Sequence, residues 1–587
     1  VLSGMPGSVF AENGEASPSK RPNVIVIMSD DQGGGDYGFL GNTIIQTPQL
    51  DAMAARSGLL NQFYVSPVCA PTRACLMTGR YNYRTRCIDT YIGRAMMDPS
   101  EITIAEILRD AGYQTGIYGK WHLGDNYPLR AMDQGFQDSL VHRGGGIGQP
   151  SDPIGAEGKY TDPTLIRNGI EVPMKGYCTD IYFDAALEFI DDCTSRGKNF
   201  FTYIATNAPH GPFHDVPQEL YEKYRKIDFS PILINRKLNA KRLQAENDKL
   251  ARIAAMITNI DQNVGRLFAR LDALKIRENT IVIYLNDNGP NSMRYVGDMR
   301  GMKSHVDDGG IRSPLIFHWP AKVKAGRVSG GLAAHIDLLP TLVEACGLKS
   351  PAAQEIDGRS FLPLLTGEDV RWPTRQLVLQ SHRGDQPQLY HHFALHEQTP
   401  GGPHWKLVHP SGFGREKYEG EPKLELYDLA KDPFQRKNLA QSHPGPFERL
   451  KGNYEMWFES VGKSRPDNYA PPRIVIGSDR ETRTVLTRQD WRHTGGRPWA
   501  ADSVGHWLLE GERQADYQLE VVLTGDFPRG KAVVRSETLE TEIELAAGKR
   551  RGHFAQVSLP RGKVKLEVEV QVDGKTRGAH QVILTRK

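Results

Sequence analysis

Polar side chains follow four short apolar runs of this 587-residue chain, at the point where each run ends. In chain order, the four groups are Asp30 and Asp31, Lys120 and His122, Asn207 and His210, and Asp287 and Asn288. If the runs are parallel strands of one sheet, their carboxyl ends meet at the edge where open α/β sheets bind ligands. We therefore expect these groups, which are far apart in the sequence, to share one site.

Three carboxylates and one amide in these groups form an all-oxygen ligand set: Asp30, Asp31, Asp287 and Asn288. Oxygen ligands suit a hard divalent cation, Ca²⁺ or Mg²⁺, better than zinc or copper. Taken alone, an Asp-Asp pair after a strand is more often a helix cap or a solvated turn. The second polar pair, after another strand, favours the metal site.

The segment Cys69-Ala-Pro-Thr-Arg73 holds a second set of reactive groups. Proline is favoured in the first turn of a helix, so Pro71 predicts a helix whose free N–H groups favour an anion near Cys69. A lone cysteine is usually a buried structural thiol. The thiolate phosphatase mechanism is excluded, because it needs a wider Cys-to-Arg spacing than Cys69 and Arg73, or Cys75 and Arg80, provide.

This pentad and several later motifs together resemble the sulfatase family. In that family the C-x-P-x-R signature directs oxidation of the cysteine to formylglycine. The resemblance extends from about residue 22 to 462, in the family's order, through Thr78-Gly-Arg-Tyr81, Gly119-Lys-Trp-His-Leu-Gly124, Asn207-Ala-Pro-His-Gly-Pro212, Ile257-Thr-Asn-Ile-Asp-Gln-Asn-Val-Gly265, Asn286-Asp-Asn-Gly289 and Leu426-Tyr-Asp-Leu-Ala-Lys-Asp-Pro433. The whole series is far more specific than the pentad alone.

The resemblance implies a sulfate ester hydrolase that uses a formylglycine made from Cys69. The hydrated aldehyde would attack sulfur and form a covalent sulfo-enzyme intermediate, which then collapses with loss of sulfate. A divalent cation, Ca²⁺ ahead of Mg²⁺, would lie beside position 69 and be held by residues that match family ligands, namely Asp30, Asp31, Asp287 and Asn288. The cation would favour the deprotonated nucleophile.

Five further residues match family positions that hold the diol and the sulfate oxygens: Arg73, Lys120, His122, His210 and Lys303. The resemblance implies that His122 is the base for the collapse step, and that His210 and Lys303 bind sulfate and donate to the leaving oxygen. Fixed cations and donors at these oxygens would stabilise the transition state. Considered singly, each histidine or lysine is more often a packed or solvated residue.

Two departures from the family pattern lie near the predicted site. Thr72 stands where serine is commoner, and Asp307-Asp308-Gly-Gly-Ile-Arg312 replaces a more usual aromatic-Glu-Gly-Gly sequence. Because the second departure follows Lys303 closely, Lys303 has the weakest sequence support of the predicted site residues. Two loops, 142–146 and 381–384, are candidate walls of the substrate pocket.

The elements that position these residues are predicted by hydrophobic spacing. From about 22 to 370, apolar runs at 23–28, 115–118, 200–205 and 280–285 alternate with helical patterns that include 241–274 and 338–346. This alternation predicts an α/β fold with a large mixed, mostly parallel central sheet flanked by helices. Strand patterns at 405–408 and 424–427, with a helical pattern at 447–461, predict a smaller antiparallel-sheet-plus-helix subdomain.

Beyond about residue 470 the pattern becomes an alternation of apolar and polar residues, at 517–523, 531–534, 542–545 and 564–570. Such strands predict an added all-β, sandwich-like domain. We therefore divide the chain into a disordered leader or signal remnant (1–20), a catalytic α/β domain (21–372), a C-terminal α+β subdomain (373–465) and a β-sandwich accessory domain (466–587). Trp491, Trp499 and Trp507 of the last domain could stack on sugars, although tryptophan in a β domain is more often core.

Composition excludes several classes of protein. The 73 Lys and Arg against 70 Asp and Glu leave a net charge of +3, too even for a nucleic-acid binder. The longest apolar runs, such as 24–28, are far shorter than the roughly 18 residues that span a membrane. Six scattered cysteines do not predict a disulfide scaffold. The sequence contains no CxxC pair, so we expect no structural zinc site. Residues 8–11 resemble the end of a cleaved signal peptide, so we expect a secreted or periplasmic protein.

The expected substrate is a sulfated carbohydrate, and the expected partner is a formylglycine-generating or other sulfatase-maturating enzyme. Two alternatives remain at this point. One is a phosphonate or phosphate ester hydrolase of the same alkaline-phosphatase-like superfamily, some members of which also carry formylglycine. The other is a non-catalytic glycan-binding protein with a vestigial site, which the complete set of metal and sulfate-contacting residues disfavours.

Overall fold

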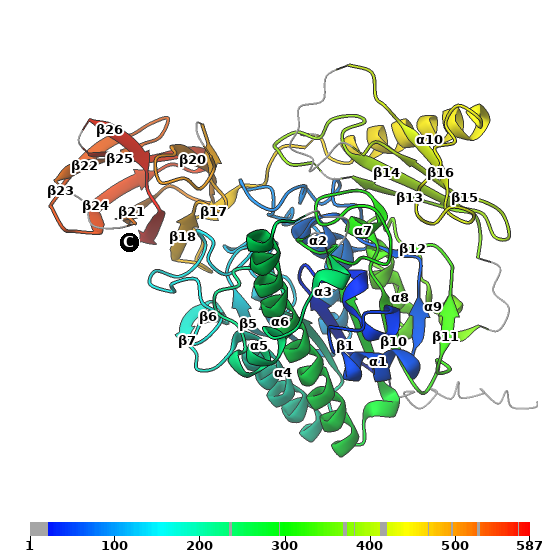
Figure 1. Cartoon of the computed structure of the whole chain (residues 1–587). Coiled ribbons are helices and arrows are strands. Elements are labelled where there is room, and N and C mark those ends of the chain that lie inside the picture. Colours follow the sequence, from blue (N-terminus) through cyan, green and yellow to red (C-terminus); the bar gives the residue numbers. More distant parts are fainter. Residues whose placement is uncertain are drawn as a thin grey trace, which may run out of the picture.

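The computed structural model describes residues 21–233, 238–292, 294–367, 372–380, 382–410, 420–467, 469–494, 497–524, 529–572 and 574–587 (Figure 1). The expected leader, 1–20, lies outside the described residues. The largest sheet has the strand order β11 (Arg327–Ser329), β2 (Gly58–Leu60), β10 (Leu315–His318), β9 (Thr280–Asn286), β1 (Asn23–Ser29), β8 (Phe200–Ala205), β4 (Gln114–Lys120), β5 (Asp138–His142), β6 (Thr164–Arg167) and β7 (Ile170–Pro173).

The middle of this sheet is parallel, because β9, β1, β8, β4 and β5 all run in one direction. The flanking strands β10 and β6 are antiparallel to β9 and β5. The predicted α/β fold with a mixed, mostly parallel sheet is confirmed, and β1, β4, β8 and β9 cover the four strands expected from the sequence.

Alternate side chains of β1 point into two separate cores, as the period of a strand requires. Val24, Val26 and Met28 pack into the core that contains α2 (Cys69–Thr78), α3 (Ile104–Asp110), α8 (Leu338–Ala345) and α9 (Leu362–Thr366). Ile25 and Ile27 pack into the other, which contains α1 (Pro48–Ala55), α4 (Cys178–Ser195) and α6 (Ala240–Ala273). A sheet covered on both faces leaves its strand ends as the place for a site.

The short helices α5 (Gln218–Tyr224) and α7 (Asp308–Ile311) and the strand pair β3 (Phe63–Tyr64) and β12 (Ala333–Ala334) complete this part of the chain. A four-stranded antiparallel sheet follows, with β13 (Arg375–Gln380), β14 (Phe393–Gln398), β15 (His404–Val408) and β16 (Glu425–Asp428). The helix α10 (Pro444–Gly462) covers it through Leu450 and Tyr454, and the Tyr454 ring stacks on Phe393 at 3.6 Å.

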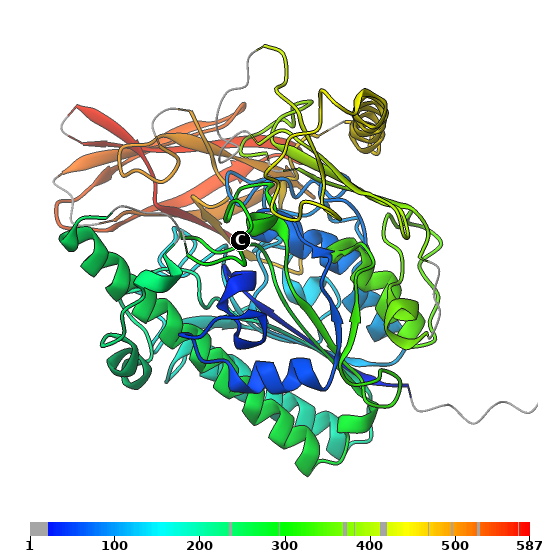
Figure 2. The same ribbon diagram turned by 45° about the vertical axis from the view of Figure 1, so that its right-hand side comes forward.

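The C-terminal strands form two facing sheets around one core. The larger contains β17 (Ile474–Ile476), β19 (Arg492–His493), β20 (Gly505–Gly511), β22 (Gly530–Arg535), β23 (Glu540–Leu545), β25 (Gly562–Val572) and β26 (Lys575–Gly578). The smaller contains β18 (Arg483–Thr487), β21 (Ala515–Val522), β24 (Arg551–Leu559) and β27 (Gln581–Arg586). Trp491 and Trp507 are fully buried between them. We call residues 474–586 the β domain; it is orange to red in Figure 2.

None of the helices in the described ranges is long and apolar enough to cross a bilayer. All six cysteines are free and buried, including Cys178 and Cys193 at the two ends of α4. The expected domain limits at 372/373 and 465/466 fall between α9 and β13 and between α10 and β17.

Candidate functional site

The ends of β1 and β9 bring the predicted metal ligands together. Ser29 and Asn286, the last residues of the two strands, are register partners in a parallel pair. The residues that follow them therefore leave the same edge of the sheet side by side. The backbone N–H of Asp31 donates to Oδ1 of Asp287 at 3.2 Å, and Nδ2 of Asn288 donates to Oδ1 of Asp31 at 2.8 Å.

Cys69 reaches this edge from the first turn of α2. The helix begins at Cys69 itself, with Val68 in extended conformation as N-cap, and Pro71 lies in its first turn as expected. One carboxylate oxygen of Asp30, one of Asp287 and the Cys69 sulfur lie within 4.8 Å of one another. The hydroxyl of Thr72 donates to the backbone oxygen of Asp287 at 2.7 Å, so threonine at this position joins α2 to the end of β9.

Three buried oxygen atoms in this group lack a hydrogen-bond donor: Asp30 Oδ1, Asp31 Oδ2 and Asn288 Oδ1. A buried acceptor without a partner is costly, about 1–3 kcal/mol for each neutral group and more for a charged one. A divalent cation would satisfy all three at once, and oxygen is its preferred ligand. The residues present therefore fit a hard cation.

Three cationic side chains face the same carboxylates. Arg73 Nη2 lies 2.8 Å from Asp287 Oδ2, Lys303 Nζ lies 2.5 Å from Asp31 Oδ1, and Lys120 Nζ pairs with Asp30. Arg73, Lys120 and the carboxylates are fully or almost fully buried. Buried charges persist only when paired or bound to metal, so this cluster is held as one unit.

The cluster changes the acidity of its members. Burial alone would raise the pKa of the Asp30 carboxyl, but Lys120, then His210 and Lys303, hold it below its usual value. Burial also raises the pKa of the Cys69 thiol, and here too Lys120 and Lys303 outweigh it and lower the pKa. The positive charges therefore favour an anion at position 69.

The two histidines are fixed by carbonyl groups. Nε2 of His122 donates to the backbone oxygen of Thr90 at 3.0 Å, which leaves Nδ1 buried without a partner. Burial, and then the charge of Lys120, lower the pKa of His122 well below the usual value. Its imidazole is therefore neutral at neutral pH, with Nδ1 free to accept a proton. Nδ1 of His210 lies 2.7 Å from the backbone oxygen of Gly211, and its Nε2 lies 3.7 Å from Asp31 Oδ2.

The predicted site residues thus lie together at this edge of the sheet, and His122 joins them through the lining of a shared cavity. Lys303, which had the weakest sequence support, is among them. The nearby departure has its own structural role, because Asp308 accepts from Lys406 Nζ at 2.6 Å and from the Tyr64 hydroxyl at 3.1 Å.

A cavity of about 560 Å³ opens over this group. Cys69, His122, His210 and Lys303 form its base, and Gly145 and Arg383 of the two predicted wall loops also line it. Ser381 of the second loop lies outside the described residues. Sequence reasoning missed three other parts of the lining, which are Thr90-Tyr91, Gln149 and the segment Arg497-Pro-Trp-Ala500. Trp499 was one of three tryptophans that the sequence analysis named as able to stack on sugars, but nothing in the sequence distinguished it from the other two.

Comparison with known proteins finds two family models. The model described as Sulfatase matches residues 22–348, and one described as N-sulphoglucosamine sulphohydrolase, C-terminal, matches residues 301–446. Both matches end before the β domain begins.

Named sulfatases are similar to much of the chain. The N-acetylgalactosamine-6-sulfatase of Canis lupus familiaris is 31% identical over 383 residues, which are 60% of this chain and 68% of the relative. The N-acetylgalactosamine-6-O-sulfatase of Bacteroides thetaiotaomicron is 27% identical over 527 residues, 76% of this chain and 94% of the relative. The crystal structure of Ps i-CgsB in complex with k-i-k-neocarrahexaose has a TM-score of 0.64 at 24% identity, covering 77% of this chain and 95% of that one, and shows the same fold.

Proposed function

The chain belongs to the sulfatase family, an assignment that makes it a sulfate ester hydrolase, and from this premise we propose that it removes sulfate from a sulfated carbohydrate. The observation that carries the proposal is the group of three unpartnered oxygens beside Cys69. We include in it a divalent cation at Asp30, Asp31, Asp287 and Asn288, with Ca²⁺ ahead of Mg²⁺. The carbohydrate class is supported by the sulfated sugars named for the relatives.

Formylglycine made from Cys69 by a sulfatase-maturating enzyme would supply the hydroxyl nucleophile for sulfur. The cation would supply positive charge at the sulfate oxygens. The chain's own residues have two roles around the nucleophile and the cation. Arg73 and Lys120 hold the carboxylates and the nucleophile in place, and Lys303 and His210 face the cavity, where they can donate to sulfate and leaving-group oxygens.

His122 is the residue that can accept a proton in this arrangement. Its Nε2–H is committed to Thr90, so only Nδ1 can act as the base. The geometry therefore assigns one tautomer to the reaction. A sulfated carbohydrate is a substrate met outside the cytoplasm, and we accordingly propose a secreted or periplasmic protein.

The first experiment separates this proposal from its alternatives. The protein is expressed with a maturating enzyme, the peptide containing Cys69 is examined by mass spectrometry, and an aryl sulfate and an aryl phosphonate are assayed side by side. We expect conversion of Cys69 and faster turnover of the sulfate. Faster turnover of the phosphonate would support the phosphonate hydrolase. An unmodified Cys69 with no turnover of either ester would support a glycan-binding protein with a vestigial site.

A further inference from the structure

The cavity over Cys69 has a wall that comes from the β domain. Four consecutive residues of that domain line it: Arg497, Pro498, Trp499 and Ala500. They are more than 400 positions beyond Cys69 in the chain and lie outside both family matches, which end at residues 348 and 446. The catalytic edge and the β domain thus enclose one space.

The β domain is fixed against the catalytic domain near this wall. Arg492 Nη1 donates to the backbone oxygen of Ile92 at 2.9 Å, and Gln489 Nε2 donates to that of Thr90 at 2.6 Å. The Thr90 oxygen also accepts from His122, so one carbonyl contacts both the proposed base and the β domain. Met96 of the catalytic domain is buried in the β-domain core.

The segment that forms the wall is held on both sides of Trp499. The indole N–H of the buried Trp491 donates to the backbone oxygen of Pro498 at 2.9 Å, and Arg488 Nη1 donates to that of Ala500 at 2.5 Å. The indole N–H of Trp499 itself donates to the backbone oxygen of Arg488 at 3.1 Å. A side chain fixed in this way loses little freedom when a ligand binds.

Trp499 differs from the other two tryptophans of the β domain. Trp491 and Trp507 are fully buried, whereas Trp499 is 38% exposed. Its ring meets Tyr91 edge-to-face, with centroids 5.8 Å apart and planes at 74°. A large apolar ring that is fixed, exposed and beside a catalytic cavity is suited to pack against the apolar face of a sugar.

The wall adds a positive charge, that of Arg497, to a cavity that other cationic side chains also line. Lys303, Arg383 and Arg497 line it, and no carboxylate is among its lining residues in the part of the chain that the structure describes. Arg383 is already paired with Asp89 at 3.0 Å and lies over the Tyr91 ring at 5.4 Å. Within the described ranges, no side chain makes a hydrogen bond or ion pair with the guanidinium of Arg497. Arg497 is therefore available to an anion, which its planar fork can hold by two bonds.

We propose that the β domain completes the substrate site, with Trp499 packing against the sugar and Arg497 binding a second anionic group of a sulfated acidic saccharide. This rests on the proposed function, because it takes Lys303, His210 and the residues around Cys69 as the site of the sulfate that is removed. The second anion is a sulfate or a carboxylate, and both bind a guanidinium in the same way.

The test compares wild type, Arg497→Ala and Trp499→Ala on four compounds: an aryl sulfate, a neutral sugar with one sulfate ester, and that sugar joined to a second sulfate or to a uronate. For Arg497→Ala we expect kcat/KM to fall about tenfold to a hundredfold on either doubly anionic saccharide, mainly through KM. The aryl sulfate and the singly sulfated sugar should change less than about threefold. Trp499→Ala should lower kcat/KM about tenfold on all saccharides.

Arg561→Ala is the matched control, since Arg561 is an exposed arginine of the same domain between β24 and β25 and outside the cavity lining. It should behave as wild type. Among the described residues the guanidinium of Arg497 has no hydrogen-bond or ion-pair partner, so its variant remains informative if Trp499→Ala proves unstable in a melting experiment. A preference for the second sulfate over the uronate, or the reverse, identifies the anion.

The outcomes separate the two proposals. If wild type hydrolyses aryl sulfate and Arg497→Ala matches it on every saccharide, or loses the same factor on all four compounds, the inference about the β domain is wrong. If wild type hydrolyses no sulfate, the proposed function fails instead. In that case saccharide binding still decides the inference. The affinities of wild type and Arg497→Ala are measured from the quenching of tryptophan fluorescence. Equal affinities would overturn the inference, and weaker binding by the variant would support it.

Discussion

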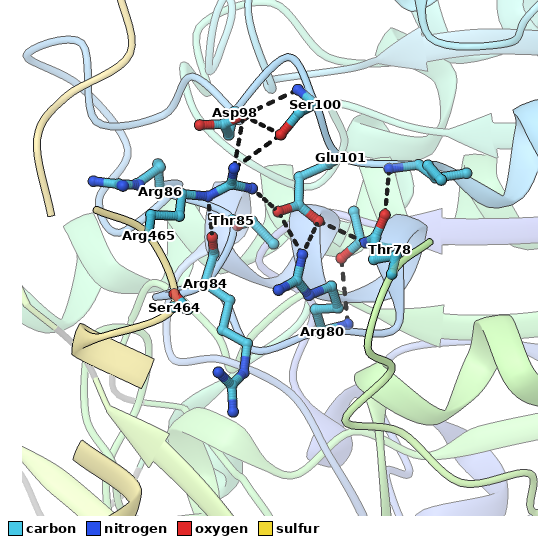
Figure 3. A network of polar contacts seen from close by, with 12 residues as sticks. Thr78, Arg80, Arg84, Thr85, Arg86, Asp98, Ser100, Glu101, Ser464 and Arg465 are labelled. Atoms are coloured by element: carbon cyan, nitrogen blue, oxygen red, sulfur yellow. Dashed lines mark hydrogen bonds and ion pairs between the residues drawn. The ribbon is translucent and has the colours of Figure 1, made fainter. Parts of the chain in front are cut away.

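Two buried clusters in this molecule pair cationic side chains with carboxylates, and they have opposite character. One lies at the ends of β1 and β9 around Cys69. The other surrounds Glu101 and joins the segment after α10 to the catalytic domain (Figure 3). Glu101 accepts from Arg80 at 3.0 Å, from Gln354 at 2.7 Å and from Arg465, and Arg465 also donates to Ser100 at 2.8 Å.

The difference lies in what each cluster leaves unsatisfied. Both oxygens of Glu101 accept hydrogen bonds, whereas Asp30, Asp31 and Asn288 each keep one buried oxygen without a donor. A cluster whose carboxylate oxygens all accept hydrogen bonds stabilises the fold and has no free oxygen for a cation. A cluster that keeps buried oxygens without a donor can bind a cation, and it lowers the stability of the fold when the cation is absent. Unpartnered oxygens, and not charge alone, therefore distinguish the functional cluster.

The largest effect is expected at position 69. Cys69→Ala removes the proposed precursor of the nucleophile, so turnover of an aryl sulfate should fall by at least about a thousandfold. The melting temperature should stay near that of wild type. Cys193→Ala, which removes a buried thiol of α4 far from this edge, is the control and should retain activity. Substantial turnover by Cys69→Ala would refute the assignment.

Next comes removal of the cation. Chelation should lower turnover about a hundredfold or more, and added Ca²⁺ should restore it. Ca²⁺ at a hundred times its Kd should stabilise wild type by about 2.7 kcal/mol, visible as a rise in melting temperature. Asp31→Asn should lose that rise, whereas Asp98→Asn in the Glu101 cluster should keep it. A rise of the same size in both variants would place the ion elsewhere.

The Glu101 cluster should respond in the opposite way. Glu101→Ala leaves Arg80 and Arg465 without their buried partner, and we expect a loss of about 2 kcal/mol or more in the free energy of unfolding. Turnover per folded molecule should change little. Asp110→Asn removes an exposed carboxylate that pairs with Arg109 and should cost less than about 0.5 kcal/mol. Lost turnover in a Glu101→Ala protein that remains folded would erase the contrast between the clusters.

The smallest effect concerns pH. A base works in its neutral form, and the pKa of His122 is lowered by burial and by Lys120. As pH falls through 6.5, the ordinary histidine pKa, the rate of sulfate release that contributes to kcat should therefore hold, and it should decline only at lower pH. A rate profile measures this directly. An acidic limb with its midpoint at or above 6.5 would exclude His122 as the base, as would an unchanged limb in His122→Gln.

Much of the fold and site could be predicted from the sequence because both depend on local patterns. The runs that became β1 and β9 are apolar between their first and last residues, which is typical of strands buried on both faces. Since parallel strands share one edge, the polar residues after them could be placed together before any coordinates. Pro71 predicted a first turn near Cys69 but does not fix which residue begins the helix, and only the structure shows that this residue is Cys69.

The sequence by itself determined the chemistry: the Cys69 pentad, the oxygen ligands and the sheet that unites them all follow from residue types and spacing. Only the tertiary structure decided which residues of the β domain line the cavity over Cys69. The packing of one domain against another depends on surface shape and on contacts such as Gln489 with Thr90, which leave no periodic pattern in a chain. Nothing in the sequence distinguishes Trp491, Trp499 and Trp507, and only that packing places Trp499 in the wall of the cavity over Cys69.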